Sequence, residues 1–393
     1  MKSIRIAYVV SDLKRVGPTN QTLNIIKNSC YKKDSILITL FKEDDNDTMI
    51  KEYKTNSIEV LCLNLNRISF IITGQKKILK ILKKYQINLV HSYGIKPDCL
   101  CEKVCKKINI KHIITLRNYP KEDILTRMNF IKGRIALYNH LNALLKCDNV
   151  ICCSKSIADL MKKDYPKHKF NYIQNGVDID KFKKINSSEK EKLREKYLID
   201  KNKLVYISTG SMIHRKRINE TIEGFIKANM KDSLLLLLGD GPLLKEIKNE
   251  YENNNNIIFV GKTDKVIEYL QLSDVFISSS ESEGLPNSVL EAIACGLPII
   301  LSNIPQHKEI IMELPCAGKC YKLGDINELA TLINNIKKDK CRCNITDSSF
   351  NMLNMSKKYT DYYKKILQEG RNKKWKKLLK KYQRFFQMNY TWK

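Results

Sequence analysis

The chain has 393 residues, of which 43% are hydrophobic; it is long enough for two or three domain cores, and a wholly disordered protein is excluded. Its 15 glycines and 9 prolines exclude a collagen-like or linker-dominated architecture, and no apolar run is long enough to span a bilayer. The formal net charge of +28 favours an anionic partner, such as nucleic acid, an acidic lipid leaflet or a phosphate-bearing substrate, unless it only reflects a chain rich in lysine throughout.

Short apolar runs alternate with amphipathic stretches through the first half of the chain. Runs of about four to eight apolar residues predict strands that are covered on both faces. The alternation of such strands with helices predicts a parallel sheet with helical crossovers. The predicted strands are 4–10, 36–40, 88–91, 113–116 and 149–153, and the predicted helices are 20–31, 68–85, 97–109 and 131–146.

The same alternation repeats in the second half, after a polar, charged segment at 180–200. The predicted fold class is therefore α/β, with two Rossmann-like, doubly wound parallel-sheet domains facing a central cleft. In such folds ligands bind beyond the carboxyl ends of the strands, so functional motifs are sought there. The predicted strands are 204–209, 234–239, 257–260, 275–278 and 298–301, and the predicted helices are 218–228, 243–251, 266–270, 288–295 and 309–313.

A polar loop and a helix come after the predicted strand at 275–278, in the sequence SSESEGLPNSVLEAIACG. Pro286 suits the start of this helix, whose first N–H groups form a positive pole that favours a phosphate. Glu283 precedes the helix and Glu291 lies about a turn inside it, so their carboxylates suit hydrogen bonds from sugar hydroxyls and from a ribose diol. The alternative is that Glu283 only caps the loop and that Glu291 is an ordinary exposed helical residue.

Three cations come after the predicted strand at 204–209, in the sequence GSMIHRKR. Arg215, Lys216 and Arg217 are expected at the carboxyl edge of the sheet, where lysine supplies a point charge and arginine a bidentate fork for a diphosphate. The alternative is a solvated basic turn.

Two glycine-containing loops also connect a predicted strand to a predicted helix. Gly241 precedes Pro242, which suits a first helical turn, although an ordinary turn is the favoured explanation of this loop when it is taken alone. Gly17 lies between the first strand and the first helix, where backbone N–H groups can face a ligand. The spacing there is not G-x-G-x-x-G, so the fingerprint of nicotinamide cofactors is absent.

Thirteen cysteines are scattered along the chain. The N-terminal apolar run lacks the length and the cleavage site of a signal peptide, so we expect reduced thiols. The cysteine spacings are C-x-C and C-x-x-x-C rather than the paired C-x-x-C of a zinc ribbon, so buried thiols are expected and no metal site is predicted.

The C-terminal region is predicted to be helical from 348 to 369 and then strongly basic. From Arg371 to Lys393 there are nine Lys or Arg and no Asp or Glu, and apolar side chains recur at a spacing of three to four residues. This amphipathic basic segment either contacts an anionic leaflet or packs on the N-terminal domain.

Taken together, these motifs resemble those of a known family. The spacing of Glu283 and Glu291 resembles the E-x7-E motif of retaining glycosyltransferases of family 4, in glycosyltransferase group 1, which have the GT-B fold. EGLPNSVLEAIACGLPII resembles the family signature along its whole length, and TGSMIHRKRINETIEGF aligns Lys216 with the family's phosphate-binding lysine. VGPTNQTLNIIK, YIQNGVDIDKF, LLGDGPLLKEI and FVGKTDKV resemble further segments, so the resemblance covers most of residues 5–310.

The resemblance implies a division into two domains and a set of site residues. Residues 1–182 would form the acceptor-side domain, completed by helices in 348–393, and residues 183–347 the sugar-nucleotide-side domain. Glu283 and Lys216 would be catalytic, and His91, Arg117 and Asn118 would lie on the acceptor side. The implied donor-binding set is Gly17, Gly210, Ser211, Arg215, Lys216, Gly241, Glu283, Gly284, Leu285, Pro286, Asn287 and Glu291.

Two positions depart from the family pattern. Ser211 stands where the family usually has an arginine, so Arg215 or Arg217 is expected to replace that charge, or else the phosphate site is weaker. Arg117 and Asn118 come after the strand that ends at Leu116, where the family often has a histidine.

The resemblance implies transfer of a sugar, with retention of anomeric configuration, from a nucleoside-diphosphate sugar, with a UDP-sugar favoured. The acceptor would be a saccharide or a lipid-linked saccharide in the biosynthesis of a surface polysaccharide such as capsule or O-antigen. No metal or other cofactor and no nucleic acid are expected, and the location would be cytoplasmic or peripheral on the inner face of the membrane. The alternatives are an epimerase-type sugar-nucleotide enzyme of the same fold and a basic nucleic-acid-binding protein.

Overall fold

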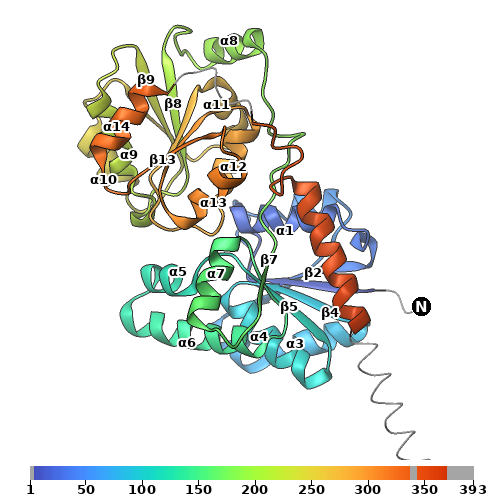
Figure 1. The fold of residues 1–393 in the computed structure, drawn as a ribbon. Helices are drawn as coiled ribbons and strands as arrows, with labels where there is room; N and C mark the ends of the chain where they lie inside the picture. Colours follow the sequence, from blue (N-terminus) through green and yellow to red (C-terminus); the bar gives the residue numbers. More distant parts are fainter. Residues whose placement is uncertain (1–3, 337–342, 370–393) are drawn as a thin grey trace, which may run out of the picture. The chain divides into compact units, whose positions relative to one another are not determined.

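The computed structural model describes residues 4–336 and 343–369, which contain two parallel β-sheets (Figure 1). The first sheet has the strand order β3-β2-β1-β4-β5-β6-β7, and the second has the order β10-β9-β8-β11-β12-β13. In each sheet the chain runs outward in one direction and then resumes on the other side of the first strand. This reversal falls between β1 and β4 and between β8 and β11, and it is where doubly wound sheets bind ligands.

The first sheet and its helices occupy the first half of the chain. Its strands are β1 (Ile6–Val10), β2 (Ser35–Phe41), β3 (Glu59–Leu65), β4 (Leu89–Tyr93), β5 (Lys111–Leu116), β6 (Val150–Cys152) and β7 (Phe170–Tyr172). The helices are α1 (Gly17–Lys27), the 3-10 turn η1 (Lys32–Asp34), α2 (Ile50–Thr55), α3 (Arg67–Lys84), α4 (Ile95–Ile108), α5 (Pro120–Arg127), α6 (Phe130–Lys146) and α7 (Lys155–Asp164).

The second sheet repeats the plan. Its strands are β8 (Leu204–Thr209), β9 (Ser233–Leu238), β10 (Ile257–Gly261), β11 (Val275–Ser278), β12 (Ile299–Ser302) and β13 (Gly318–Tyr321). The helices are α8 (Ser187–Lys196), the 3-10 turn η2 (His214–Lys216), α9 (Ile218–Ala228), α10 (Leu244–Tyr251), α11 (Val266–Leu272), α12 (Asn287–Ala294), α13 (Pro305–Glu313) and α14 (Ile326–Asn335).

The central strands are buried on both faces, as their continuous apolar sequences require. Every residue of β1 and of β9 is buried, and the side chains of β9 pack with those of α9 and α14 in one core. Three strands were missed from the sequence, namely β3, β7 and β13, and each lies at the edge of a sheet. An edge strand needs less apolar cover, so its residues alternate or are polar, and the rule of continuous apolar runs does not detect it.

The described chain divides into two compact units. The first holds the residues up to Thr115, the segment Tyr138–Val150 and the chain from Ser356 to residue 369, and the second holds Leu116–Leu137 and Ile151–Met355. The sequence-based domain boundary near residue 182 stays a prediction.

A C-terminal helix spans 352–369 (Figure 1). From Ser356 onward it belongs to the first unit, where Tyr359 and Tyr363 are fully buried. The sequence predicted its start at 348, but residues 348–351 form a turn in which Ser348 and Asn351 hydrogen-bond to neighbouring backbone. Residues from Arg371 to Lys393 lie outside the described part of the chain, so the expectation about their basic segment stays a prediction.

In the described residues no helix combines the length and apolar character needed to cross a bilayer.

Cys316 and Cys343 form a disulfide, so the expectation of reduced thiols is wrong for this pair. The sequence did not reveal the pair, because nothing in the spacing indicates that two cysteines 27 residues apart would meet.

Candidate active site

Two loops of the second unit meet at the carboxyl ends of β8 and β11. Lys216 and Arg215 lie in η2, which comes after β8, and Glu283 lies in the loop between β11 and α12. The Lys216 ammonium forms an ion pair with Glu283 Oε1, and Arg215 Nη1 lies 3.2 Å from Glu283 Oε2. Arg215 Nη1 also donates to the Ser282 carbonyl at 2.7 Å. The structure therefore brings together three of the residues that the sequence placed in the donor site.

The charge balance of this cluster is positive. Glu283 is buried, which by itself would raise its pKa, but the neighbouring Lys216 and Arg215 outweigh burial and lower the pKa to about 2. Glu283 is thus ionised at neutral pH, and two cations face one carboxylate. Arg215 Nε is buried and has no hydrogen-bond partner among the described residues, so the hydrogen-bonding capacity of this guanidinium is not fully used in the structure.

Glycines allow these loops to approach closely. A Cβ on Gly210 would lie 3.4 Å from Lys216 Cε, so the glycine leaves room for the lysine side chain over the end of β8. A Cβ on Gly239, which has φ +136°, would lie 1.8 Å from the Gly210 carbonyl oxygen, and a Cβ on Gly241 would lie 2.4 Å from that of Met212. The loop after β9 therefore supports the lysine-bearing loop by backbone packing.

The sequence expectation for the residue after Gly241 is corrected. Pro242 was expected in the first helical turn, but α10 begins at Leu244 and Pro242 lies in a turn before it. The backbone there is held instead by hydrogen bonds to the neighbouring loop, with Leu243 N donating to the Met212 carbonyl at 3.1 Å.

The N-terminus of α12 adjoins the Glu283 loop. Pro286 is the N-cap, and the first amide to bond back into the helix is that of Leu290, to the Pro286 carbonyl at 3.4 Å. The amides of the first turn precede this bond and point out of the N-terminal end, an arrangement that suits a phosphate.

Glu291 lies one turn further along α12 and is half-buried. Burial raises its pKa to about 7, and Lys181 opposes this rise only in part. This differs from an ordinary exposed helical glutamate, because the carboxyl loses its proton within the neutral range and is then poised to accept hydrogen bonds from a ligand.

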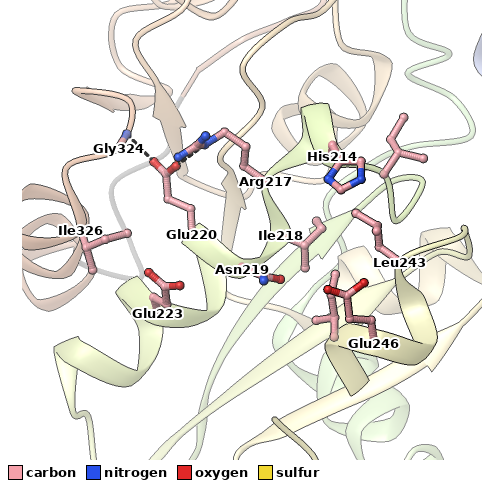
Figure 2. A pocket seen from close by; sticks show the side chains of 12 residues that line it. His214, Arg217, Ile218, Asn219, Glu220, Glu223, Leu243, Glu246, Gly324 and Ile326 are labelled. Carbon is pink, nitrogen blue, oxygen red and sulfur yellow. Dashed lines mark hydrogen bonds and ion pairs between the residues drawn. The ribbon is translucent and has the colours of Figure 1, made fainter. Parts of the chain in front are cut away.

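Arg217 does not join the cluster, and Ser211 is exposed. Arg217 has φ +47° at the start of α9, and its Nε donates to Glu220 Oε2 at 2.5 Å. Ser211 stands where the family usually has an arginine, and Arg215 and Arg217 were the two candidates to replace its charge. Of these two, Arg215 is therefore the one beside Glu283. Arg217 and Glu220 instead line a pocket that contains none of Arg215, Lys216 and Glu283 (Figure 2). This pocket has a volume of about 330 Å³, and at its edge Glu220 also accepts a hydrogen bond from Gly324 N.

The residues expected on the acceptor side take different positions. Arg117 Nη1 donates to Asn175 Oδ1 at 2.9 Å, and Asn118 Nδ2 donates to Asp123 at 2.9 Å. Asn175 Nδ2 in turn donates to the Leu285 carbonyl at 3.0 Å and to Asn287 Oδ1 at 3.1 Å, all within the second unit. Asn175 is thus a contact of the 284–287 loop. The sequence analysis noted its segment, YIQNGVDIDKF, only for its resemblance to the family and predicted no site role for Asn175.

The 284–287 loop also leaves no room for a side chain at its first residue. A Cβ on Gly284 would lie 1.8 Å from the Arg117 carbonyl oxygen and 2.8 Å from Asn118 Oδ1. This close approach explains the glycine and fixes the backbone just before the N-terminus of α12.

His91 and Gly17 lie in the first unit. His91 is fully buried, with Nδ1 2.7 Å from the Tyr363 hydroxyl and Nε2 2.7 Å from the Thr115 hydroxyl. An acceptor cannot reach it in this structure, so the expected acceptor role finds no support here. Gly17 is the first residue of α1, and its expected approach to the donor stays a prediction.

Within residues 4–336 and 343–369, no group of three or more His, Cys, Asp or Glu side chains is placed to hold a metal ion.

Comparison with known proteins connects this geometry to a family. The family model described as "Glycosyltransferase Family 4" matches residues 38–181, and the model described as "Glycosyl transferases group 1" matches residues 189–352. The first match ends at residue 181 and the second begins at residue 189, in the first turn of α8.

Individual relatives agree with the family models. The chain is 27% identical to the O-antigen biosynthesis glycosyltransferase WclY of Escherichia coli, over 93% of this chain and 99% of the relative. It is 26% identical to an E. coli UDP-Gal:alpha-D-GlcNAc-diphosphoundecaprenol alpha-1,3-galactosyltransferase, over 78% and 82% of the two chains. The structure of Anabaena HepE with UDP and glucose superposes with a TM-score of 0.77 at 16% identity, over 92% of this chain and 99% of HepE.

Proposed function

Because this chain belongs to the group 1, family 4 glycosyltransferases with the GT-B fold, we propose that it transfers a sugar from a nucleoside-diphosphate sugar with retention of anomeric configuration. A UDP-sugar is the proposed donor, since HepE was solved with UDP and glucose and an E. coli relative is named for UDP-Gal. The proposed acceptor is a saccharide or a lipid-linked saccharide of a surface polysaccharide, a class that the names of the E. coli relatives support. The proposed place of action is the cytoplasmic face of the membrane.

The observation that carries this proposal is the cluster of Lys216 and Arg215 around Glu283. Transfer breaks the bond between the anomeric carbon and a diphosphate oxygen, so negative charge grows on the leaving group while the sugar becomes cationic. Cations and amides that are already in place stabilise that charge without reorganisation. Two partly buried cations with one buried carboxylate, beside the N-terminus of α12, supply such an environment.

The proposed roles are those that the family resemblance implies, and the positions of these residues support them. Lys216 and the first amides of α12 hold the diphosphate, Glu291 accepts from the ribose hydroxyls, and Glu283 faces the donor sugar while it orients both cations. The acceptor oxygen bonds to the anomeric carbon on the face that the diphosphate leaves, and the acceptor proton passes to a diphosphate oxygen. This front-face displacement needs no enzyme nucleophile and conserves the configuration.

No metal is required in this proposal, because Lys216 and Arg215 supply the positive charge that a divalent cation supplies in other sugar-nucleotide sites. Transfer by the purified enzyme is expected to continue at an unchanged rate in EDTA. A loss of activity that Mg²⁺ or Mn²⁺ restores would overturn this part of the proposal.

The donor is tested by thermal unfolding with UDP-, GDP- and ADP-sugars. We expect one nucleotide class to raise the melting temperature of the wild type, and Lys216→Ala to abolish that rise. Lys196→Ala is the matched control, because this exposed lysine pairs with Glu268 on α11. If the donor raised the melting temperature of Lys216→Ala and of the wild type equally, the assignment of the donor site to Lys216 would be wrong.

Retention is tested separately by NMR of the anomeric proton of the product, which we expect to have the same anomeric configuration as the donor.

A further inference from the structure

His307 is a fully buried histidine in the second unit, outside the proposed set of donor-binding residues. It lies in the first turn of α13 and comes shortly after Ser302, the last residue of β12. His307 Nδ1 is 2.9 Å from the Ser302 carbonyl oxygen and 3.0 Å from Ser302 Oγ. Because a carbonyl oxygen only accepts, Nδ1 carries a proton. Nε2 is buried and has no hydrogen-bond partner among the described residues.

The ring of His307 is neutral at pH 7, and the charges of the donor cluster act on it. Burial lowers the pKa of His307 to about 4; the Glu283 carboxylate opposes this fall, and Lys216 adds to it. A second proton, on Nε2, would find no acceptor in the part of the chain that the structure describes. It would also add positive charge where two cations already face one carboxylate. The ring therefore keeps a single proton, on the nitrogen that faces Ser302.

Three hydrogen bonds lead from His307 to Glu283. Ser302 Oγ donates to the Ser280 carbonyl oxygen at 2.5 Å, so its only proton is used there, and at the 3.0 Å contact it accepts from His307 Nδ1. The Ser280 hydroxyl in turn donates to the Glu283 carboxylate and helps to lower its pKa. Both serines are fully buried, so bulk water does not compete for these bonds.

We propose that His307 is a positioning residue, which fixes the Glu283 carboxylate for sugar transfer through these two buried serines. This inference deepens the proposed function and rests on it. Lys216 and Arg215 pair with the carboxylate as cations, and Ser280 adds a neutral hydrogen bond. Supporting bonds of this kind keep a charged group in the orientation that stabilises the transition state. The ring of His307 is buried, so it acts through Glu283 and does not touch the donor.

The first unit contains a matched histidine that serves as a control. Ser92 Oγ donates to Asp98 Oδ1 at 2.5 Å, so His112 Nε2, which lies 2.8 Å from Ser92 Oγ, is the donor at that contact. His112 Nδ1 is buried and has no partner among the residues described. His112 thus shares with His307 the bond to a serine hydroxyl and the bare second nitrogen, but its serine leads to an aspartate outside the donor cluster.

Steady-state kinetics of sugar transfer by the full-length protein test the proposal. His307→Phe keeps a ring of similar size and removes the donor to Ser302. We expect its kcat to fall at least about tenfold while KM for the donor changes less than about twofold, because the groups that hold the diphosphate remain. His307→Asn supplies an amide N–H near the position of Nδ1 and is expected to keep kcat within about threefold of the wild type.

The control variant is His112→Phe, which is expected to leave kcat unchanged. Far-UV circular dichroism and thermal unfolding check that each variant is folded. If His307→Phe does not fold, Ser302→Ala takes its place, because it removes only the hydroxyl in the middle of the chain of hydrogen bonds. It should likewise lower kcat at least about tenfold.

A double-mutant cycle tests whether the effect passes through Glu283. In the Glu283→Ala background there is no carboxylate left to position, so His307→Phe is expected to lower kcat further by less than about twofold. A merely structural role for His307 would lower kcat by the same factor in both backgrounds.

The outcomes separate this inference from the proposed function. Unchanged kcat in folded His307→Phe or in Ser302→Ala would overturn the positioning role, and so would an equal fall with and without Glu283. A wild type that transfers no sugar from any of the donors would overturn the proposed function itself, and the positioning role with it.

Discussion

The two sheets place a polar side chain at corresponding strands, and they use it differently. β4 lies beside β1 in the first sheet and carries His91, whereas β11 lies beside β8 in the second and leads to Glu283. Tyrosine and threonine hydroxyls occupy both nitrogens of His91, and the ring is fully buried. Glu283 also is buried, but its partners are two cations, and one of them keeps an unpartnered donor.

The difference lies in the groups that pack around each side chain. The C-terminal helix 352–369 brings Tyr359 and Tyr363 onto the first sheet, where they pack with His91 and close the polar cluster. Neutral groups also contribute at Glu283, through a hydrogen bond from Ser280, but the two cations outnumber the one carboxylate, so positive charge remains in excess in this cluster. A polar residue near a strand end is therefore a candidate site residue only when the cluster around it has unbalanced charge or unused hydrogen-bonding groups.

The largest effect is expected from Lys216→Ala. Removal of this cation withdraws a preorganised charge from the leaving diphosphate, and kcat/KM is expected to fall by at least about 100-fold. Transfer of labelled sugar from the donor identified in the screen measures this fall.

The control for this variant is Lys196→Ala, which is expected to retain the activity of the wild type. If Lys216→Ala kept near-normal turnover, Glu283 and its surroundings would resemble the closed cluster around His91, and the proposed site would fail.

Glu283→Gln is expected to act on stability as well as on transfer. The carboxyl has a pKa of about 2 in the folded protein and an ordinary value of 4.5, so its ion pairs stabilise the wild type above about pH 4.5. This contribution is lost as the pH falls from about 4.5 through about 2. Urea unfolding between pH 7 and pH 3 should show a smaller loss of stability in Glu283→Gln than in the wild type.

An identical pH dependence in both proteins would mean that the Glu283 ion pairs do not form in solution. At pH 7 we also expect transfer by Glu283→Gln to fall by at least about tenfold, because Lys216 and Arg215 lose the group that orients them.

The contribution of Glu291 to stability depends on pH with the opposite sign to that of Glu283. Its pKa of about 7 lies above the ordinary 4.5, so its contribution to stability is complete below pH 4.5 and is lost as the pH rises through 7. Donor binding should show the reverse trend, because the ionised carboxylate is the better acceptor for ribose hydroxyls.

We expect the KM for the donor to improve several-fold between pH 6 and pH 8 in the wild type and to stay flat in Glu291→Gln. Glu283 remains ionised over this range and serves as the internal reference. A flat profile in the wild type would place Glu291 away from the donor.

The sequence was sufficient for the central elements of the fold. β8, β11 and α9 have the predicted bounds, because their apolar patterns are set by burial on both faces or on one helix face. β3, β7 and β13 were missed because edge strands need less apolar cover. The short helices α2, α5 and α8 have weaker patterns, whereas α7 and α14 were also not named although each buries one apolar face.

The sequence predicted which residues belong to the candidate site better than it predicted which of them contact each other. Lys216 and Glu283 were expected near one diphosphate from their positions after strands, but their ion pair depends on two loops meeting, 67 residues apart. The choice of Arg215 over Arg217 depends on the left-handed backbone of Arg217, and the burial of His91 depends on tyrosines about 270 residues away. Such tertiary partners leave no local signal in the sequence.

The smallest effect on catalysis, and a clear effect on stability, is expected from His91→Phe. The substitution removes the hydrogen-bond partner that Thr115 and Tyr363 share. Because Thr115 keeps its bond to Tyr359 and Tyr363 keeps its bond to Tyr8, the expected cost is about 1 kcal/mol of unfolding free energy. Transfer should be unchanged once the enzyme is folded, because the ring is closed from solvent by the C-terminal helix. Urea unfolding and kcat/KM measured on the same preparation separate the two effects. Tyr363→Phe is the matched variant, since it removes the other side of the same hydrogen bond and should cost a similar amount. A fall of more than about tenfold in kcat/KM for His91→Phe, with stability intact, would instead show that the first sheet carries a reactive group and that the two sheets are alike in function.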